Sequence, residues 1–257
     1  MRNHFLRAAT SKSSYDANAQ TYIAAVEAAD GQALETATRD AINAFVVDCK
    51  ADGIWTAIKA CCILAGARTL AGALVPLVGT APTNNNFVSG DYNRKTGLVG
   101  NGSTKYLNSN RANNVDPQNS KHLASYISTI ASGPVMGTST YATNGWSGIY
   151  YDGISNFYNS GLNTGNGVFA SIGGVVLAGF NGASRNTSNQ ITNRRNGVSA
   201  SLTSNSFTPV ADNITVFTGV LGFASSRIAF YSIGEFLDLT KLGTRVTALI
   251  TAINAAF

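Results

Sequence analysis

The sequence predicts a mainly β protein, an antiparallel two-sheet sandwich flanked by helices. Between residues 54 and 235, short runs rich in Val, Ile, Tyr, Phe and Thr alternate with clusters of Gly, Asn and Ser. About ten or more such runs at short spacing favour a sandwich over a propeller or a βαβ fold. Apolar residues at helical spacing replace this pattern at both ends. We therefore expect a helical attachment segment over 1–53, a sandwich domain over 54–235 and a C-terminal helix within 236–257.

Two amphipathic helices joined by a tight glycine link are expected before residue 54. Ser14 or Asp16 can cap the first helix, Gly31 ends it, and Gly53 ends the second. The apolar residues that share one face are Tyr15, Ala19, Tyr22, Ile23 and Val26 in the first helix and Leu34, Ala37, Ala41, Ile42, Phe45 and Cys49 in the second. Such a hairpin must cover an apolar surface, either the sandwich or a partner.

The C-terminal segment is predicted to form a third amphipathic helix. Asp238 is a plausible N-cap. The apolar residues at a spacing of three and four are Leu239, Leu242, Val246, Leu249 and Ile253. This helix either docks on its own domain or forms a short coiled-coil seam between subunits.

Two hairpins stand out within the strand-rich region. Asn196-Gly197 lies between two strand-like runs and favours a type I′ turn. A second hairpin is expected in YYDGISNFY, with its turn at Asp152-Gly153. Both support antiparallel pairing.

Charge and cysteine content restrict the function classes. Charged residues make up only 12% of the chain, and the net charge of +5 comes from basic residues scattered along the sequence. A nucleic-acid-binding protein usually concentrates its basic residues on one face, so we expect no nucleic-acid partner. Cys49, Cys61 and Cys62 form no disulfide framework, and the pair in IKACCILAG is expected to be buried thiol.

No targeting or membrane segment is expected. The N-terminal stretch MRNHFLRAATSKSSYDANAQ lacks the apolar region of a signal peptide. No stretch approaches the ~20 apolar residues that a membrane span needs. We therefore expect synthesis in a reducing cytoplasm and no membrane insertion.

The inventory of reactive side chains argues against an enzyme. Between Asp52 and Glu235 there is no glutamate, and only four aspartates occur, at positions 91, 116, 152 and 212. The two histidines, His4 and His122, have no partners at catalytic or zinc-binding spacing, and G-x-S-x-G is absent. Asp91 and Asp152 would be the candidates for calcium, but nothing indicates that they converge. We expect no catalytic residue, no metal and no cofactor.

An aromatic segment provides the candidate ligand-binding residues. NGWSGIYYDGISNFYNSG concentrates aromatic rings among Asn and Gly, as sugar-binding faces do. The candidates for glycan binding are Trp146, Tyr150, Tyr151 and Tyr158. The alternative is that alternate members fill the core, because adjacent residues such as Tyr150 and Tyr151 face opposite sides of a sheet.

Four segments resemble a family of tailed-phage and prophage virion proteins. They are AINAFVVDCKADGIWTAIKACCILAG, FVSGDYNRKTGLVGNGSTKYLNSN, HLASYIS and IAFYSIGEFLDLTKLGTRVTALITAI. The resemblance covers most of Asp40 to Ile253 and is weak over Thr129–Asn213. It implies a concanavalin-A-like or laminin-G-like jelly roll and a place in tail fibres, baseplates or other surface parts of a virion. It supplies no catalytic residues.

These observations lead to a functional expectation. We expect a non-enzymatic virion structural protein of the tail, fibre or baseplate apparatus, with other virion proteins as partners and a host surface glycan as a candidate ligand. One alternative is a capsid decoration or cement protein with the same fold. Another is a polysaccharide depolymerase, which the scarcity of carboxylates disfavours.

Surplus apolar surface on the terminal helices predicts assembly into an oligomer, with a trimer as the first expectation for a fibre. Short helices take their stability from packing, and we expect one sandwich edge to bury only some of them. The predicted interface residues are Tyr22, Val26, Phe45, Leu242, Val246, Leu249 and Ile253.

Overall fold

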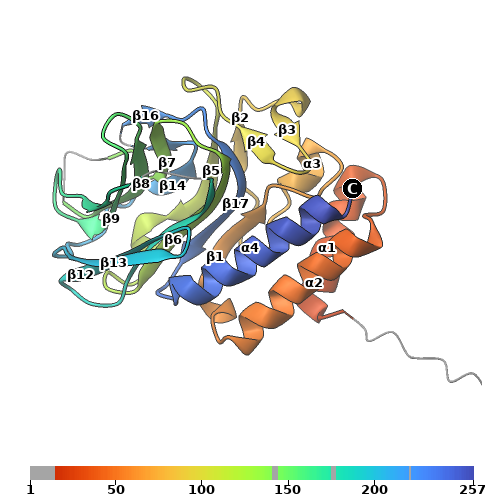
Figure 1. The fold of residues 1–257 in the computed structure, drawn as a ribbon, viewed down its shortest axis with the longest axis horizontal. Helices are drawn as coiled ribbons and strands as arrows, with labels where there is room; N and C mark the ends of the chain where they lie inside the picture. The colour runs from red at the N-terminus through yellow and green to blue at the C-terminus, as the bar shows by residue number, and fades with distance from the viewer. Residues whose placement is uncertain (1–14, 141–143, 175–177, 220) are drawn as a thin grey trace, which may run out of the picture.

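The computed structural model describes residues 15–140, 144–174, 178–219 and 221–257. They form a jelly-roll sandwich of two antiparallel sheets with a layer of helices against one of them (Figure 1). This confirms the predicted fold class, including the N-terminal helical hairpin and the C-terminal helix. Ser14, one of the two proposed caps, and His4 lie outside the described residues.

The first sheet carries the helices and has eight strands among the described residues. In spatial order they are β13 (Val198–Thr203), β12 (Gln190–Arg195), β11 (Gly179–Arg185), β6 (Lys121–Thr129), β17 (Arg227–Gly234), β4 (Gly97–Val99) and β3 (Tyr92–Asn93), with β1 (Ile58–Ile63) also paired to β17. All of these pairs are antiparallel.

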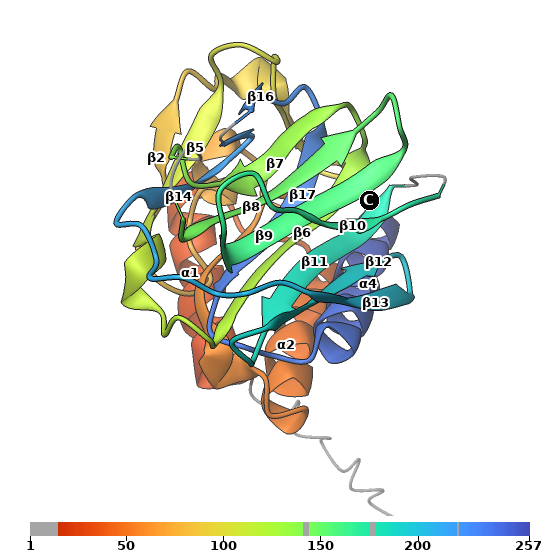
Figure 2. The ribbon, with the colours of Figure 1, turned by 90° about the vertical axis from the view of Figure 1, so that its left-hand side faces the viewer.

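The second sheet has seven strands in the described part of the chain and faces the viewer in Figure 2, with the helices behind. Its order is β10 (Ala170–Ile172), β9 (Phe157–Thr164), β8 (Trp146–Asp152), β7 (Gly133–Gly137), β14 (Asn213–Val216), β5 (Tyr106–Ala112) and β2 (Thr83–Asn85). A small hairpin, β15 (Thr218–Gly219) and β16 (Gly222–Phe223), follows β14 and contacts β7.

Local sequence signals set the ends of the helices, which are α1 (Ala17–Asp30), α2 (Thr36–Ala51), the short α3 (Leu70–Ala73) and α4 (Leu239–Ala255). The side chain of Asp16 accepts a hydrogen bond from Asn18 N, and that of Asp238 accepts one from Thr240 N at 2.7 Å. Gly31 ends α1 at a φ of 66°. These three signals confirm the predicted ends.

The link between α1 and α2 is longer than the sequence suggested. The second helix begins at Thr36, because Leu34 N donates to Glu27 Oε1 at 2.9 Å instead of joining the helix.

None of the described helices is both long and apolar enough to cross a lipid bilayer. Single 3₁₀ turns occur at Trp55–Ala57, Ser89–Asp91 and Asn113–Val115.

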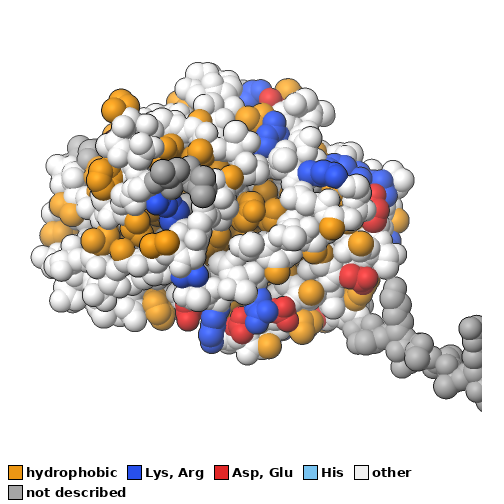
Figure 3. All heavy atoms as spheres, viewed as in Figure 1, with side chains coloured by type: hydrophobic (Ala, Val, Ile, Leu, Met, Phe, Trp, Pro, Cys, Tyr) orange, Lys and Arg blue, Asp and Glu red, His pale blue; other side chains and the backbone are white. Residues whose placement is uncertain are grey.

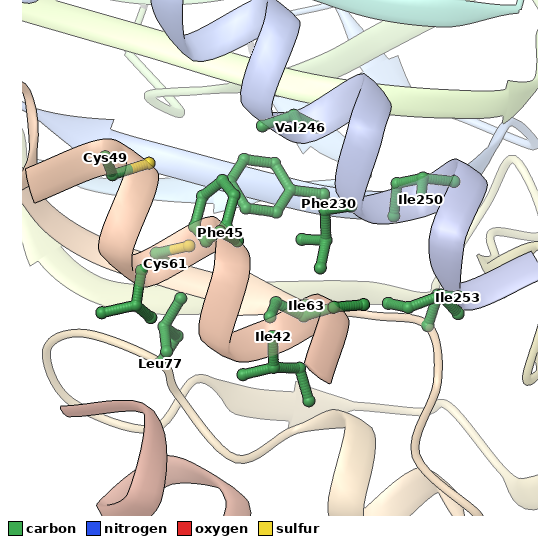
Figure 4. Close-up of a cluster of buried hydrophobic side chains, with 14 of the residues drawn as sticks. Ile42, Phe45, Cys49, Cys61, Ile63, Leu77, Phe230, Val246, Ile250 and Ile253 are labelled. Carbon is green, nitrogen blue, oxygen red and sulfur yellow. The ribbon is translucent and has the colours of Figure 1, made fainter. Parts of the chain in front are cut away.

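Two hydrophobic clusters divide the interior. One fills the space between the sheets, where Leu123 and Ile127 of β6 and Ile149 of β8 are buried. The other lies between the helices and the outer side of the first sheet. There the rings of Phe45 and Phe230 meet edge to face at 5.7 Å (Figure 4). Strand β1 contributes to both clusters, which explains why the run IKACCI is apolar at almost every position.

The packing of the helices corrects the prediction of a partner interface. Figure 4 shows α2 and α4 turning Phe45, Val246 and Ile253 toward the sheet. All seven predicted interface residues are buried within this chain: Tyr22, Val26, Phe45, Leu242, Val246, Leu249 and Ile253. The prediction was wrong because the sheet is wide enough for α1, α2 and α4 to share one core. A homo-oligomer stays a prediction, but these seven residues no longer support it.

Both predicted hairpins are present, but only one of the two turns lies at the predicted residues. Arg195 pairs with Val198, and Asn196 and Gly197 both have positive φ, at 43° and 88°. This is the expected type I′ turn. The other loop spans residues 153–156, because Asp152 is still in the strand and pairs with Phe157. That turn therefore comes later than predicted.

Candidate functional site

The outer face of the seven-stranded sheet carries a row of small residues. Strand register aligns Asn108, Thr215, Gly137, Gly148 and Gly161 across five neighbouring strands. The adjacent positions Leu107, Val216, Met136 and Ile149 point into the inter-sheet core, so this row faces the opposite side. The glycines leave a shallow trough with room for groups that lie flat on the sheet.

Trp146 lies in this trough. A Cβ on Gly161 would come within 2.6 Å of the indole, so only glycine leaves space for it there. The indole Nε1 donates to Gly165 O at 2.9 Å, and the ring of Phe169 meets the indole edge to face at 5.0 Å. The indole is therefore enclosed, and Trp146 is only 1% exposed.

The structure corrects most of the predicted glycan-binding residues. Besides Trp146, Tyr158 is 1% exposed and faces the inter-sheet core, and Tyr151 is 7% exposed with its hydroxyl donating to Asn156 Oδ1. None of these three presents a ring to solvent, because Trp146 is enclosed on the outer face and the other two rings are packed inside the protein. Tyr150 is half-buried on the outer face, so its role in binding stays a prediction.

An open cleft lies at the other end of the row of small residues. It has a volume of about 420 Å³ and lies between β5, β14 and the β15–β16 hairpin. We call it the outer-face cleft; its described lining residues are Tyr106, Asn108, Ser139, Asp212, Asn213, Thr215, Thr218, Gly219 and Phe223. It combines aromatic, amide, hydroxyl and carboxylate groups in one surface.

Two aromatic rings form one wall of the outer-face cleft. Tyr106 of β5 and Phe223 of β16 meet edge to face at 6.1 Å. Tyr106 lines the cleft on the face opposite its neighbour Leu107 and also packs against the edge of the inter-sheet core, and the hairpin brings Phe223 over the sheet. Both side chains are half-buried, which leaves part of each ring accessible to a ligand.

The polar groups of the cleft are held in place. Asp212 Oδ2 accepts hydrogen bonds from Ser139 Oγ at 2.9 Å and from Thr140 N at 2.8 Å. Burial alone would raise the pKa of Asp212, but the hydrogen bonds from Thr140 and Ser139 lower it below its ordinary value. Asn108 Oδ1 accepts from Asn110 N at 2.9 Å, which fixes the orientation of its amide. The cleft therefore presents an ionised carboxylate beside oriented amides.

A second concave surface lies between α4 and the first sheet. It has a volume of about 890 Å³, with Tyr126 and Phe180 at its floor and small residues such as Thr247 and Ala248 along the helix. Arg194 is the one charged residue in its described lining. Figure 3 shows that charged side chains on this face of the molecule gather mostly over the helices, while the sandwich is mostly uncharged.

The remaining polar candidates have structural roles. Asp91 binds Lys105 at 2.5 Å and Val88 N, and Asp152 accepts from Ile154 N in its turn. His122, expected at the start of a strand, is fully buried between Ser232 Oγ and Glu235 O. Within the described ranges, no group of three or more His, Cys, Asp or Glu is placed to hold a metal ion.

The cysteines are buried thiols, as the sequence predicted for the pair Cys61 and Cys62. Cys49, Cys61 and Cys62 are all free and buried. Burial raises the pKa of each thiol above its ordinary value, to about 12 for Cys49 and Cys62. The thiolate form is therefore disfavoured at neutral pH, which makes these residues poor nucleophiles.

No family model and no curated protein matches the sequence. Solved structures of other proteins share part of the fold. A Trypanosoma rangeli sialidase in complex with 2,3-difluoro-KDN aligns with a TM-score of 0.44 and 10% identity over 76% of this chain and 33% of that one. Domain 4 of the arabinanase AbnA from Geobacillus stearothermophilus, in complex with arabinotriose, aligns with a TM-score of 0.41 and 13% identity over 65% and 82%. The binding domain of botulinum neurotoxin DC, in complex with SialylT, aligns with a TM-score of 0.39 and 13% identity over 56% and 39%.

These likenesses concern the fold alone. The present chain covers less than half the length of the sialidase and of the toxin domain. None of the three is described as a phage protein, so the resemblance to virion proteins rests on the sequence segments given above.

Proposed function

We propose that this chain is a non-enzymatic surface protein of a phage virion that binds a host glycan in the outer-face cleft. The observation that carries the glycan proposal is the convergence of Asp212, Asn108 and Asn213 beside the Tyr106 and Phe223 rings. The C–H face of a sugar packs on an aromatic ring, while its hydroxyls bind amides and carboxylates. An open cleft of about 420 Å³ suits one or two sugar residues of a longer chain.

The absence of hydrolysis is part of the proposal. Sugar hydrolysis generally needs two carboxyl groups on opposite sides of the bond to be cleaved. Asp212 is the only carboxylate among the residues described as lining the cleft. A carboxylate that is ionised and held by two hydrogen bonds is suited to accepting bonds from sugar hydroxyls rather than to donating a proton.

The place in a virion is supported by the sequence resemblance and by the low charge of the chain. Mass spectrometry of purified phage particles, followed by antibody labelling in electron micrographs, tests it. Label at the tail, fibre or baseplate would support the proposal, whereas label spread over the capsid would favour the decoration alternative. Absence from the particle would contradict both.

Glycan binding is tested with surface polysaccharide immobilised from the host bacterium. Tyr106→Ala should weaken binding about tenfold or more, because a stacked ring contributes on the order of 1.5 kcal/mol. Tyr150→Ala tests the remaining predicted binding residue, because Tyr150 lies on the same sheet face but outside the cleft lining, and it should leave binding unchanged if the cleft is the site. If Tyr150→Ala abolishes binding and Tyr106→Ala does not, the outer-face cleft is not the site.

A further inference from the structure

The outer-face cleft has a one-sided charge. Asp212 is the only charged side chain in its described lining. A ligand that enters the cleft therefore meets a carboxylate with no cation among the described lining groups.

The two basic residues in and next to β5, Lys105 and Arg111, already form ion pairs with carboxylates. Lys105, which precedes Tyr106, binds Asp91 Oδ1 at 2.5 Å. Arg111, near the end of the same strand, binds the buried carboxylate of Asp116. These carboxylates compensate the two cations, so neither is free to balance the charge of Asp212 or to bind an acidic ligand.

The carboxylate of Asp212 is positioned to face a ligand. Both donors, Ser139 Oγ and Thr140 N, bind its Oδ2. The backbone of Asp212 is held as well, because Asn113 N, just after β5, donates a hydrogen bond to the Asp212 carbonyl oxygen at 2.8 Å. The Asp212 carboxylate is therefore held in place in the cleft lining, as an acceptor for a hydroxyl group.

We propose that the cleft selects neutral, hydroxyl-rich sugars and rejects sugars that carry a carboxylate, sulfate or phosphate. This inference rests on the glycan-binding function proposed above and names the class of sugar. A neutral sugar donates a hydroxyl to the Asp212 carboxylate and uses the Asn108 and Asn213 amides for its ring oxygen and remaining hydroxyls. An acidic sugar would place a second negative charge roughly 5 Å away, which weakens binding about fourfold in bulk water and considerably more in a partly buried cleft.

The experiment measures binding to matched pairs of oligosaccharides on an array. Each pair shares one neutral core, and one member carries a terminal sialic or uronic acid. The wild-type protein should bind neutral members at least tenfold more tightly than their acidic partners. Asp212→Asn should reduce that ratio severalfold, and Asp152→Asn, which removes an exposed carboxylate from a distant turn, should leave it unchanged.

Salt provides a second readout that does not depend on a variant folding correctly. Raising the ionic strength should narrow the wild-type ratio, because screening weakens repulsion between charges. Tighter binding of acidic members, or a ratio that neither salt nor Asp212→Asn alters, would overturn the inference while leaving glycan binding intact. No binding to either member of any pair would overturn the proposed function itself.

Discussion

The stability of the protein should fall as the pH drops from 7.5 to 5, because His122 is buried in its neutral form. Burial lowers the pKa of His122 from 6.5 to about 4, although the hydrogen bond with the Glu235 carbonyl and the charge of Asp116 favour the protonated form. Nδ1–H donates to Glu235 O at 2.6 Å, and Nε2 accepts from Ser232 Oγ at 2.7 Å. A second proton on the ring would therefore be buried in an interior arranged for the neutral ring.

The magnitude follows from the two pKa values. Below pH 6.5 the unfolded chain binds a proton that the folded chain does not bind until about pH 4. Each pH unit in that window lowers the free energy of unfolding by up to about 1.4 kcal/mol. Between pH 7.5 and 5 the loss should reach about 2 kcal/mol. The folded pKa of Asp16, Glu35 and Asp52 is lowered, so stability due to these groups is lost mainly below this range.

The assay is urea unfolding at pH 7.5, 6.5, 5.5 and 5.0, with tryptophan fluorescence as the signal. The matched variant is His122→Gln, whose side-chain amide can still donate and accept a hydrogen bond but cannot titrate. Its stability at pH 7.5 will differ from that of the wild type, but its curve against pH should be nearly flat over this range. If the wild-type curve is flat, or if the variant shows the same slope, the argument about His122 is wrong.

Three further predictions concern packing and reactivity. Phe45→Ala should lower the free energy of unfolding by about 3–5 kcal/mol, and a loss below ~1 kcal/mol would contradict the packing of the helices on the sheet. Gly161→Ala should displace the Trp146 indole and cost about 1–3 kcal/mol in the same urea assay. The control Gly90→Ala, with open space around the new methyl, should stay within ~0.5 kcal/mol, and equal effects would refute the steric account. The buried thiols, of which Cys61 is one, should react with Ellman's reagent only in denaturant; fast reaction of the native protein would show that they are accessible.

Local sequence chemistry determined the elements and several of their ends. Asp16 and Asp238 satisfy backbone N–H groups within their own first turns, and Gly31 and Gly197 adopt positive φ within a few residues of the segments that they end. Each of these signals acts over two to four residues, so the linear sequence contains all the partners. The change from strand-like to helical spacing near residues 54 and 235 is local in the same way, and it was enough to predict a sandwich flanked by helices.

Only the tertiary structure decided what covers each apolar face. Helical spacing showed that Phe45 and Val246 lie on apolar faces, but it did not show that Phe230 of a distant strand lies opposite them. Trp146 looked like a binding platform because its sequence neighbours are polar or glycine. It is buried because Gly161, fifteen positions later, leaves room for its ring on the adjacent strand.

The outer-face cleft shows the same limit most clearly. The alternation in TKYLNS places Tyr106 and Asn108 on one face of a strand, a pattern that the sequence contains. Asp212 and Phe223 reach that face only because β14 pairs with β5 and the following hairpin folds back over the sheet. Strand pairing between residues a hundred positions apart depends on the packing of the whole sandwich, and no local pattern encodes it.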